Sequence, residues 1–161
     1  MRILYTSDLH GNEGYYRQLL ALAGDLRAGA VIIGGDLLPK EGPFATSLQD
    51  QRAFLEDFLG PLLRQARAAE LDWQLYWMMG NDDWAVNLDC LQQWHDEGLA
   101  WLLPEHLYDL ADGWQLTGDP YVSLTPFSIK DWERFDHPQQ RVPQPAYQPC
   151  LSTPQGIRRT T

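Results

Sequence analysis

Three short motifs in this chain hold side chains of the kinds that bind divalent metal ions. Asp8 and His10 stand two residues apart, Asp36 ends a Gly-Gly-Asp motif, and Asn81 follows Gly80. Carboxylate oxygens, an imidazole nitrogen and a neutral amide oxygen together suit manganese, magnesium or iron. Two such ions about 3.5–4 Å apart would clamp a phosphoryl group and generate a hydroxide nucleophile at neutral pH. We therefore predict a metal centre whose ligands are Asp8, His10, Asp36 and Asn81.

Two further carboxylates, Asp82 and Asp83, directly follow Asn81. Beside a metal centre they would orient its ligands or carry protons, and we predict them as the catalytic residues. The alternative role is structural, because negative side chains stabilise the amino-terminal end of a following helix. The residues themselves are compatible with either role.

Each motif directly follows a short apolar run, and these runs predict the elements that position the site. The runs cover residues 2–7, 30–33 and 73–79, and glycines lie close to their ends. Short apolar runs of this kind are typical of buried strands in a parallel sheet. Ligands of open α/β sheets gather at the carboxyl ends of the strands. The three motifs should therefore meet at one edge of the sheet.

Helical spacing of apolar residues predicts the segments between the strands. We expect helices over residues 14–23, 48–69 and 87–96, and Gly60-Pro61 should kink or break the second one. The alternation of strand and helix implies right-handed crossovers in one α/β domain.

The regular alternation of predicted strands and helices ends at about residue 99. Residues 107–110 and 114–116 predict a strand pair, and residues 121–124 a third strand. Asp131 and its acidic neighbours are expected to form a solvated face. We expect one domain over residues 1–137 and a proline-rich, extended tail over residues 138–161.

Charge and composition narrow the classes of function. The formal net charge is −10, which disfavours binding to nucleic acid, because phosphate contacts need clustered lysine and arginine. A bound cation could still attract a phosphorylated small molecule or nucleotide. Two cysteines outside any CxxC pair argue against a disulfide framework, and no apolar stretch is long enough to span a membrane. We expect a cytoplasmic protein without a membrane partner.

The order DxH, GGD and GNxD, each after a predicted strand, resembles the calcineurin-like metallophosphoesterase superfamily over residues 1–84. The resemblance implies an αββα sandwich, an α/β fold that would be incomplete on its carboxyl-terminal side. It implies that Asp8 and His10 bind one metal, that Asp36 bridges two, and that Asn81 binds the other. The cofactors implied are two divalent ions, Mn, Fe, Zn or Mg, of which Mn is favoured.

The sequence departs from the family pattern in two places. The usual third motif has a histidine that serves the leaving group, whereas this chain has Asp82 there. The later histidine motif and the GHxH motif are not found after Asn81, so the chain resembles the amino-terminal portion of the family domain. His95, His106 and His137 remain, and we expect structural or solvent roles for them, with His137 as the better spare ligand.

Two functions follow from these observations. The first is a metal-dependent phosphoesterase that hydrolyses phosphomonoesters or phosphodiesters, acting on a phosphorylated small molecule or nucleotide. The alternative is a non-catalytic binding or assembly module that keeps the fold. A homo-oligomer would combine assembly with catalysis, because a neighbouring chain could complete the metal site.

Overall fold

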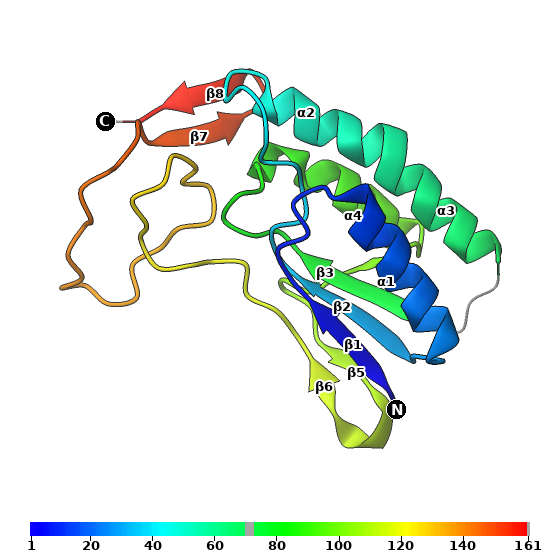
Figure 1. Ribbon diagram of the computed structural model, residues 1–161. Coiled ribbons are helices and arrows are strands. Elements are labelled where there is room, and N and C mark those ends of the chain that lie inside the picture. Colours follow the sequence, from blue (N-terminus) through cyan, green and yellow to red (C-terminus); the bar gives the residue numbers. More distant parts are fainter. Residues whose placement is uncertain (70–72, 161) are drawn as a thin grey trace.

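A parallel sheet forms the centre of the computed structural model, which describes residues 1–69 and 73–160 (Figure 1). Its four strands are hydrogen-bonded in the order β1-β2-β3-β4, and every pairing is parallel. Sequence analysis predicted the first three strands and missed β4, which is two residues long. The strands are β1 (Ile3–Thr6), β2 (Ala30–Gly34), β3 (Gln74–Met78) and β4 (Trp101–Leu102). The α/β expectation is confirmed.

The two faces of the sheet are covered by different layers. Val31 and Ile33 of β2 belong to the core shared with the helices, whereas Ala30 and Ile32 belong to a smaller cluster on the opposite face. All four are buried, as a central strand with two covered faces requires. This burial explains why β2 is a continuous apolar run.

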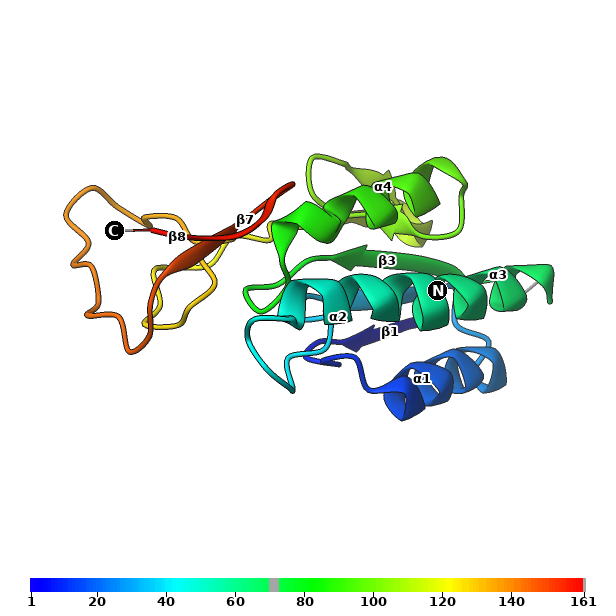
Figure 2. The ribbon, with the colours of Figure 1, turned by 90° about the horizontal axis from the view of Figure 1, so that it is seen from above.

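Helices lie along one face of the sheet (Figures 1 and 2). Leu20 of the first helix, Leu63 of the third and Leu91 of the fourth are buried in the core beneath them. Within the described residues no helix is both long and apolar enough to cross a membrane. The helices are α1 (Glu13–Asp25), α2 (Ser47–Ala53), α3 (Gly60–Ala68) and α4 (Leu88–Asp96).

Gly60-Pro61, which was expected to kink or break the long helix, does not interrupt it. A π-helical segment, η1 (Phe54–Leu59), joins α2 to α3 without interruption, and the N–H group of Gly60 donates to the carbonyl of Leu55, five residues back. A proline lacks the N–H group of a regular helix and crowds the carbonyl four residues earlier. The wider π turn before Pro61 accommodates both effects.

A short hairpin covers the other face of the sheet. Strands β5 (Tyr108–Asp109) and β6 (Gln115–Leu116) pair antiparallel, which confirms the predicted strand pair. The rings of Tyr76 on β3 and Tyr108 lie 5.1 Å apart. Residues 121–124 do not form the predicted third strand, since they make only an isolated bridge between Val122 and Glu133.

The segment expected as an extended tail contains a second hairpin. Strands β7 (Cys150–Thr153) and β8 (Gly156–Arg159) pair antiparallel, and β7 makes a bridge with Ile129. Figures 1 and 2 show the chain after β6 extending beyond the carboxyl ends of the sheet strands. The region 120–160 therefore lies on the side of the molecule where the three motifs end.

Asp131 anchors this region to the α/β layers and does not form the solvated face that was expected. Its carboxylate accepts hydrogen bonds from the backbone N–H groups of Ala85 and Ser152, both at 2.9 Å. Beside it, the indole of Trp132 donates to the carbonyl of Asp83 at 2.7 Å. Trp132 is 7% exposed and belongs to the main core.

We predict that Asp131→Ala lowers the free energy of unfolding by about 2 kcal/mol, because it leaves two partly buried N–H groups without an acceptor. Asp136→Ala is the matched control, since Asp136 is exposed and should change stability by less than about 0.5 kcal/mol. Urea denaturation of both variants checks this. Equal losses would show that Asp131 is not an anchor.

Candidate metal centre

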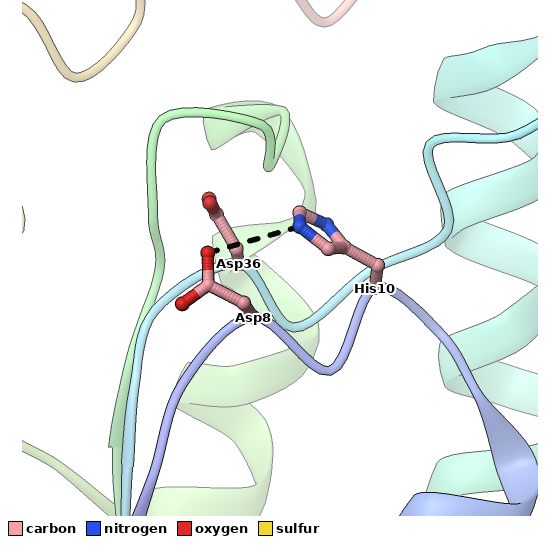
Figure 3. A group of neighbouring side chains, drawn as sticks. All are labelled: Asp8, His10 and Asp36. Atoms are coloured by element: carbon pink, nitrogen blue, oxygen red, sulfur yellow. Dashed lines mark ion pairs between the residues drawn. The ribbon is translucent and has the colours of Figure 1, made fainter.

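Asp8, His10 and Asp36 converge beyond the carboxyl ends of β1 and β2 (Figure 3). Each offers a ligand atom, and these atoms all lie within 4.8 Å of one another. The Nε2 atom of His10 lies 3.8 Å from Oδ1 of Asp8. A search of the described residues for three or more histidine, cysteine or acidic side chains close enough to hold an ion finds this group.

All three side chains project from backbone in the left-handed region. The φ angles are 58° at Asp8, 44° at His10 and 53° at Asp36. Aspartate and histidine enter this region more readily than most residues, but it still carries strain, and such strain gathers at functional sites. The left-handed turns direct the three side chains into one small volume.

The loops that carry these residues are hydrogen-bonded along their length. The N–H group of Asp8 donates to the carbonyl of Gly35 at 3.1 Å, and that of His10 donates to the carbonyl of Asp36 at 2.9 Å. Gly11 continues the pattern by donating to Leu37 at 2.9 Å. The pairing of β1 with β2 thus extends past the sheet and fixes Asp8 and His10 relative to Asp36.

The carboxylate of Asp83 joins the loop after β2 to the loop after β3. It accepts three backbone N–H groups, from Leu37 at 3.0 Å, from Leu38 at 2.8 Å and from Gly80 at 2.8 Å. Asp83 is completely buried, and its carboxylate caps no helix. This geometry favours the orienting role that the sequence left open, whereas a part in catalysis stays a prediction.

Burial raises the pKa of Asp83 to about 7, against the three N–H groups, which lower it. An aspartate of the unfolded chain has a pKa near 3.8, so the folded protein holds this proton more tightly. The contribution of Asp83 to the free energy of unfolding is therefore greatest below about pH 4 and is lost as the pH rises through 7.

Asp36 occupies the centre of the site. Its Oδ1 atom accepts the N–H group of Asp82 at 2.9 Å, and a Cβ atom on Gly80 would come within 3.0 Å of it. Burial raises the pKa of the Asp36 carboxyl, the negative charges of Asp82 and Asp8 raise it further, and the Asp82 N–H group and His10 lower it. A cation would relieve this crowding of negative charge, so the donor set fits a divalent metal ion.

Lys40 is a residue of the site that sequence analysis missed. Its Nζ atom lies 2.9 Å from Nε2 of His10 and 3.6 Å from Oδ2 of Asp82. The ammonium group is the donor in this contact and occupies the lone pair of Nε2, so a cation that binds at Nε2 must displace Lys40. Lys40 is one of two lysines in the sequence, and its position four residues after Asp36 was the available signal.

Asn81 and Asp82 lie in the turn after β3, and both are half-buried. The side-chain amide of Asn81 donates to Oδ1 of Asp82 at 3.3 Å. The backbone of Asp82 contacts Asp36, and its side chain faces Lys40. The structure therefore places Asp82 beside the group, and the roles of Asn81 as metal ligand and of Asp82 as catalytic residue stay predictions.

The remaining histidines do not join the group. The rings of His95 and His106 lie 4.7 Å apart, and Nδ1 of His95 accepts the N–H group of Leu102. His137, the expected spare ligand, is exposed and does not lie with Asp8, His10 and Asp36 among the described residues.

Comparison with known families agrees with the geometry of the motifs. The sequence model of the calcineurin-like phosphoesterases matches residues 1–145, which include all the predicted ligands. The chain belongs to this family. A search among curated proteins found no match. Membership supports the metallophosphoesterase-like α/β fold, and the matched range includes Asp8, His10 and Asp36.

We predict that Asp83→Ala lowers the free energy of unfolding at pH 7 by about 3 kcal/mol or more, because three buried N–H groups lose their acceptor. Asp82→Ala is the matched control and should lose less than about 1 kcal/mol, since its contact with Lys40 is partly exposed. Chemical denaturation measures both. The stability of Asp83→Ala should also fall less than that of the wild type between pH 4 and 7.

Similar stability losses in the two variants would contradict the claim that the Asp83 carboxylate joins the loops. An unchanged pH dependence in Asp83→Ala would contradict the raised pKa.

Proposed function

We propose that this chain is a metal-dependent phosphoesterase that hydrolyses phosphomonoesters or phosphodiesters at a dinuclear site. The observation that carries the proposal is the convergence of Asp8, His10 and Asp36 at the carboxyl edge of the sheet. Family membership supports hydrolase chemistry at this edge. Manganese is the ion we favour, because the set mixes carboxylate oxygens with one imidazole nitrogen.

In this proposal Asp8 and His10 would hold one ion, Asn81 would hold a second through its amide oxygen, and Asp36 would serve both. Ions at such a site supply a nucleophile at neutral pH and neutralise the charge of the phosphoryl group. The hydrogen bond from the Asp82 N–H group holds the Asp36 carboxylate in place. The shared position of Asp36 makes it the most sensitive ligand.

Lys40 and Asp82 act on the substrate in this account. The Lys40 ammonium lies 2.9 Å from the His10 ring, so it can approach a phosphoryl oxygen bound beside His10. Asp82 stands where the family usually has a histidine, and we propose that it serves the leaving group. Asp83 holds the loops that carry Lys40 and Asp82 by accepting backbone N–H groups, and in this proposal it does not contact the substrate.

A phosphorylated small molecule or nucleotide is the substrate class that we propose. The net charge of −10 repels long polyanions, whereas a single phosphate needs only the local positive charge of the metal centre and Lys40. Two free, buried cysteines, Cys90 and Cys150, fit the reducing, cytoplasmic location that we propose.

A non-catalytic binding or assembly module is the second candidate. The observation that favours it is the small size of the group, which contains three side chains, together with the separation of His95, His106 and His137 from it in the described residues. If a second copy of the chain supplied the missing metal ligands in a homo-oligomer, catalysis at this site would again be the favoured function.

We predict that Asp36→Asn lowers phosphodiesterase activity by about 100-fold or more, because it removes the charge of the shared ligand while keeping the side-chain shape. Asp82→Asn should lower activity less and keep the metal. Initial rates with bis(p-nitrophenyl) phosphate in manganese, together with bound manganese per chain, measure both.

Equal, mild effects of the two variants would rule out the dinuclear mechanism. A wild-type chain that binds one manganese weakly, or none, and hydrolyses no phosphoester would favour the non-catalytic module.

A further inference from the structure

A cavity of about 490 Å³ lies beside the metal centre. Its size is within the range of small-molecule sites in proteins. Four aromatic residues contribute to its lining, and Lys40 and Asp82 bring the charges. The aromatic residues that line it are Phe44, Trp84, Phe127 and Tyr147.

The charged end of the cavity contacts the metal centre directly. Lys40 lies 2.9 Å from His10, and the N–H group of Asp82 lies 2.9 Å from the Asp36 carboxylate. A phosphoryl group bound at the metal centre would therefore have its ester substituent at the mouth of this cavity.

One aromatic wall is held rigidly by polar contacts. Trp84 donates its backbone N–H group to Gln51 at 2.8 Å and its indole N–H group to Ser47 at 3.0 Å. Gln51 is buried, and its amide also donates to the carbonyl of Asp82 at 2.8 Å. The ring of Phe44 packs against Trp84 at 5.6 Å. This wall is thus fixed relative to the charged end.

Another part of the lining exposes aromatic rings on an anchored backbone. Phe127 is 50% exposed and Tyr147 is 67% exposed. Their neighbours are hydrogen-bonded, since Ala146 donates to Pro126 at 2.9 Å and Cys150 donates to Ser128 at 2.7 Å. A flat ring that enters the cavity would bury both side chains without reordering the backbone.

We propose that this cavity binds the leaving group of the phosphoester and that this group carries a flat aromatic ring, either the nucleobase of a nucleoside or a simple aryl group. The exposed rings of Phe44, Phe127 and Tyr147 can stack on such a ring, whereas the buried Trp84 supports Phe44 from behind. The Lys40 ammonium matches the phosphate of the ligand. The proposal rests on the proposed function for the position of the phosphoryl group. It adds a substrate class, namely phosphoesters of aromatic ring systems in preference to those of alkyl alcohols.

The test compares two phosphonates that cannot be hydrolysed at an ester bond. Phenylphosphonate and methylphosphonate are titrated into the manganese-loaded chain by calorimetry. We expect phenylphosphonate to bind about 10-fold more tightly, in line with the stacking of one ring on aromatic side chains. Phe127→Ala should remove most of this difference. Phe135→Ala, which alters an exposed phenylalanine outside the cavity lining, should keep it.

Equal affinity for the two phosphonates, or binding of neither, would overturn the inference. An aryl preference that survives in Phe127→Ala would also overturn it, because the ring would then bind elsewhere. Hydrolysis of bis(p-nitrophenyl) phosphate is measured separately, so an aryl preference without hydrolysis would reject the proposed activity and keep the cavity. Hydrolysis without an aryl preference would support the proposed activity and reject the proposed role of the cavity.

A third ligand distinguishes the two kinds of ring. Adenosine 5′-monophosphate that binds more tightly than phenylphosphonate, with the gain lost in Phe127→Ala, identifies a nucleobase as the occupant. Weaker binding identifies a simple aryl group.

Discussion

The buried carboxylate of Asp83 fixes the positions of the loops on which the metal centre depends. It accepts N–H groups of Leu37 and Leu38 from the loop after β2 and that of Gly80 from the loop after β3. These N–H groups belong to loops beyond the sheet, so no neighbouring strand offers them an acceptor. A buried donor without an acceptor lowers the stability of the fold. Asp83 thus joins the loops after β2 and β3. The loop after β1 is attached to them by the hydrogen bonds from Asp8 to Gly35 and from His10 to Asp36.

Holding the loops this closely concentrates negative charge. Asp8, Asp36 and Asp82 surround a small volume, and burial together with their mutual repulsion raises the pKa of Asp36. In the protein alone, the Lys40 ammonium offsets part of this charge. A site with excess negative charge, left-handed backbone at each ligand and a lysine nearby is prepared to bind a cation and then a phosphate. The same fold supplies the cavity beside it, because region 120–160 packs over the carboxyl edge through Asp131 and Trp132.

The sequence predicted the parts of the structure that follow from local patterns. Strands β1 to β3 could be predicted because each is a short apolar run. The grouping of Asp8, His10 and Asp36 could be predicted because each residue stands shortly after such a run. The role of Asp83 was not readable, since its partners Leu37 and Leu38 are more than 40 residues away in sequence and only the fold brings them together. Lys40 and Asp131 have no motif of their own. Pro61 was read as a breaker, because the local rule does not anticipate a π turn.

Anomalous X-ray scattering from manganese-soaked crystals would show whether Asp8, His10 and Asp36 hold an ion, because it locates the ion without reference to activity. We expect a manganese peak within coordination distance of Asp8, His10 and Asp36, with Lys40 displaced from the His10 ring. A second peak that shares Asp36 would support the dinuclear site. No peak at this group at saturating manganese, or a peak at other residues instead, would contradict the account.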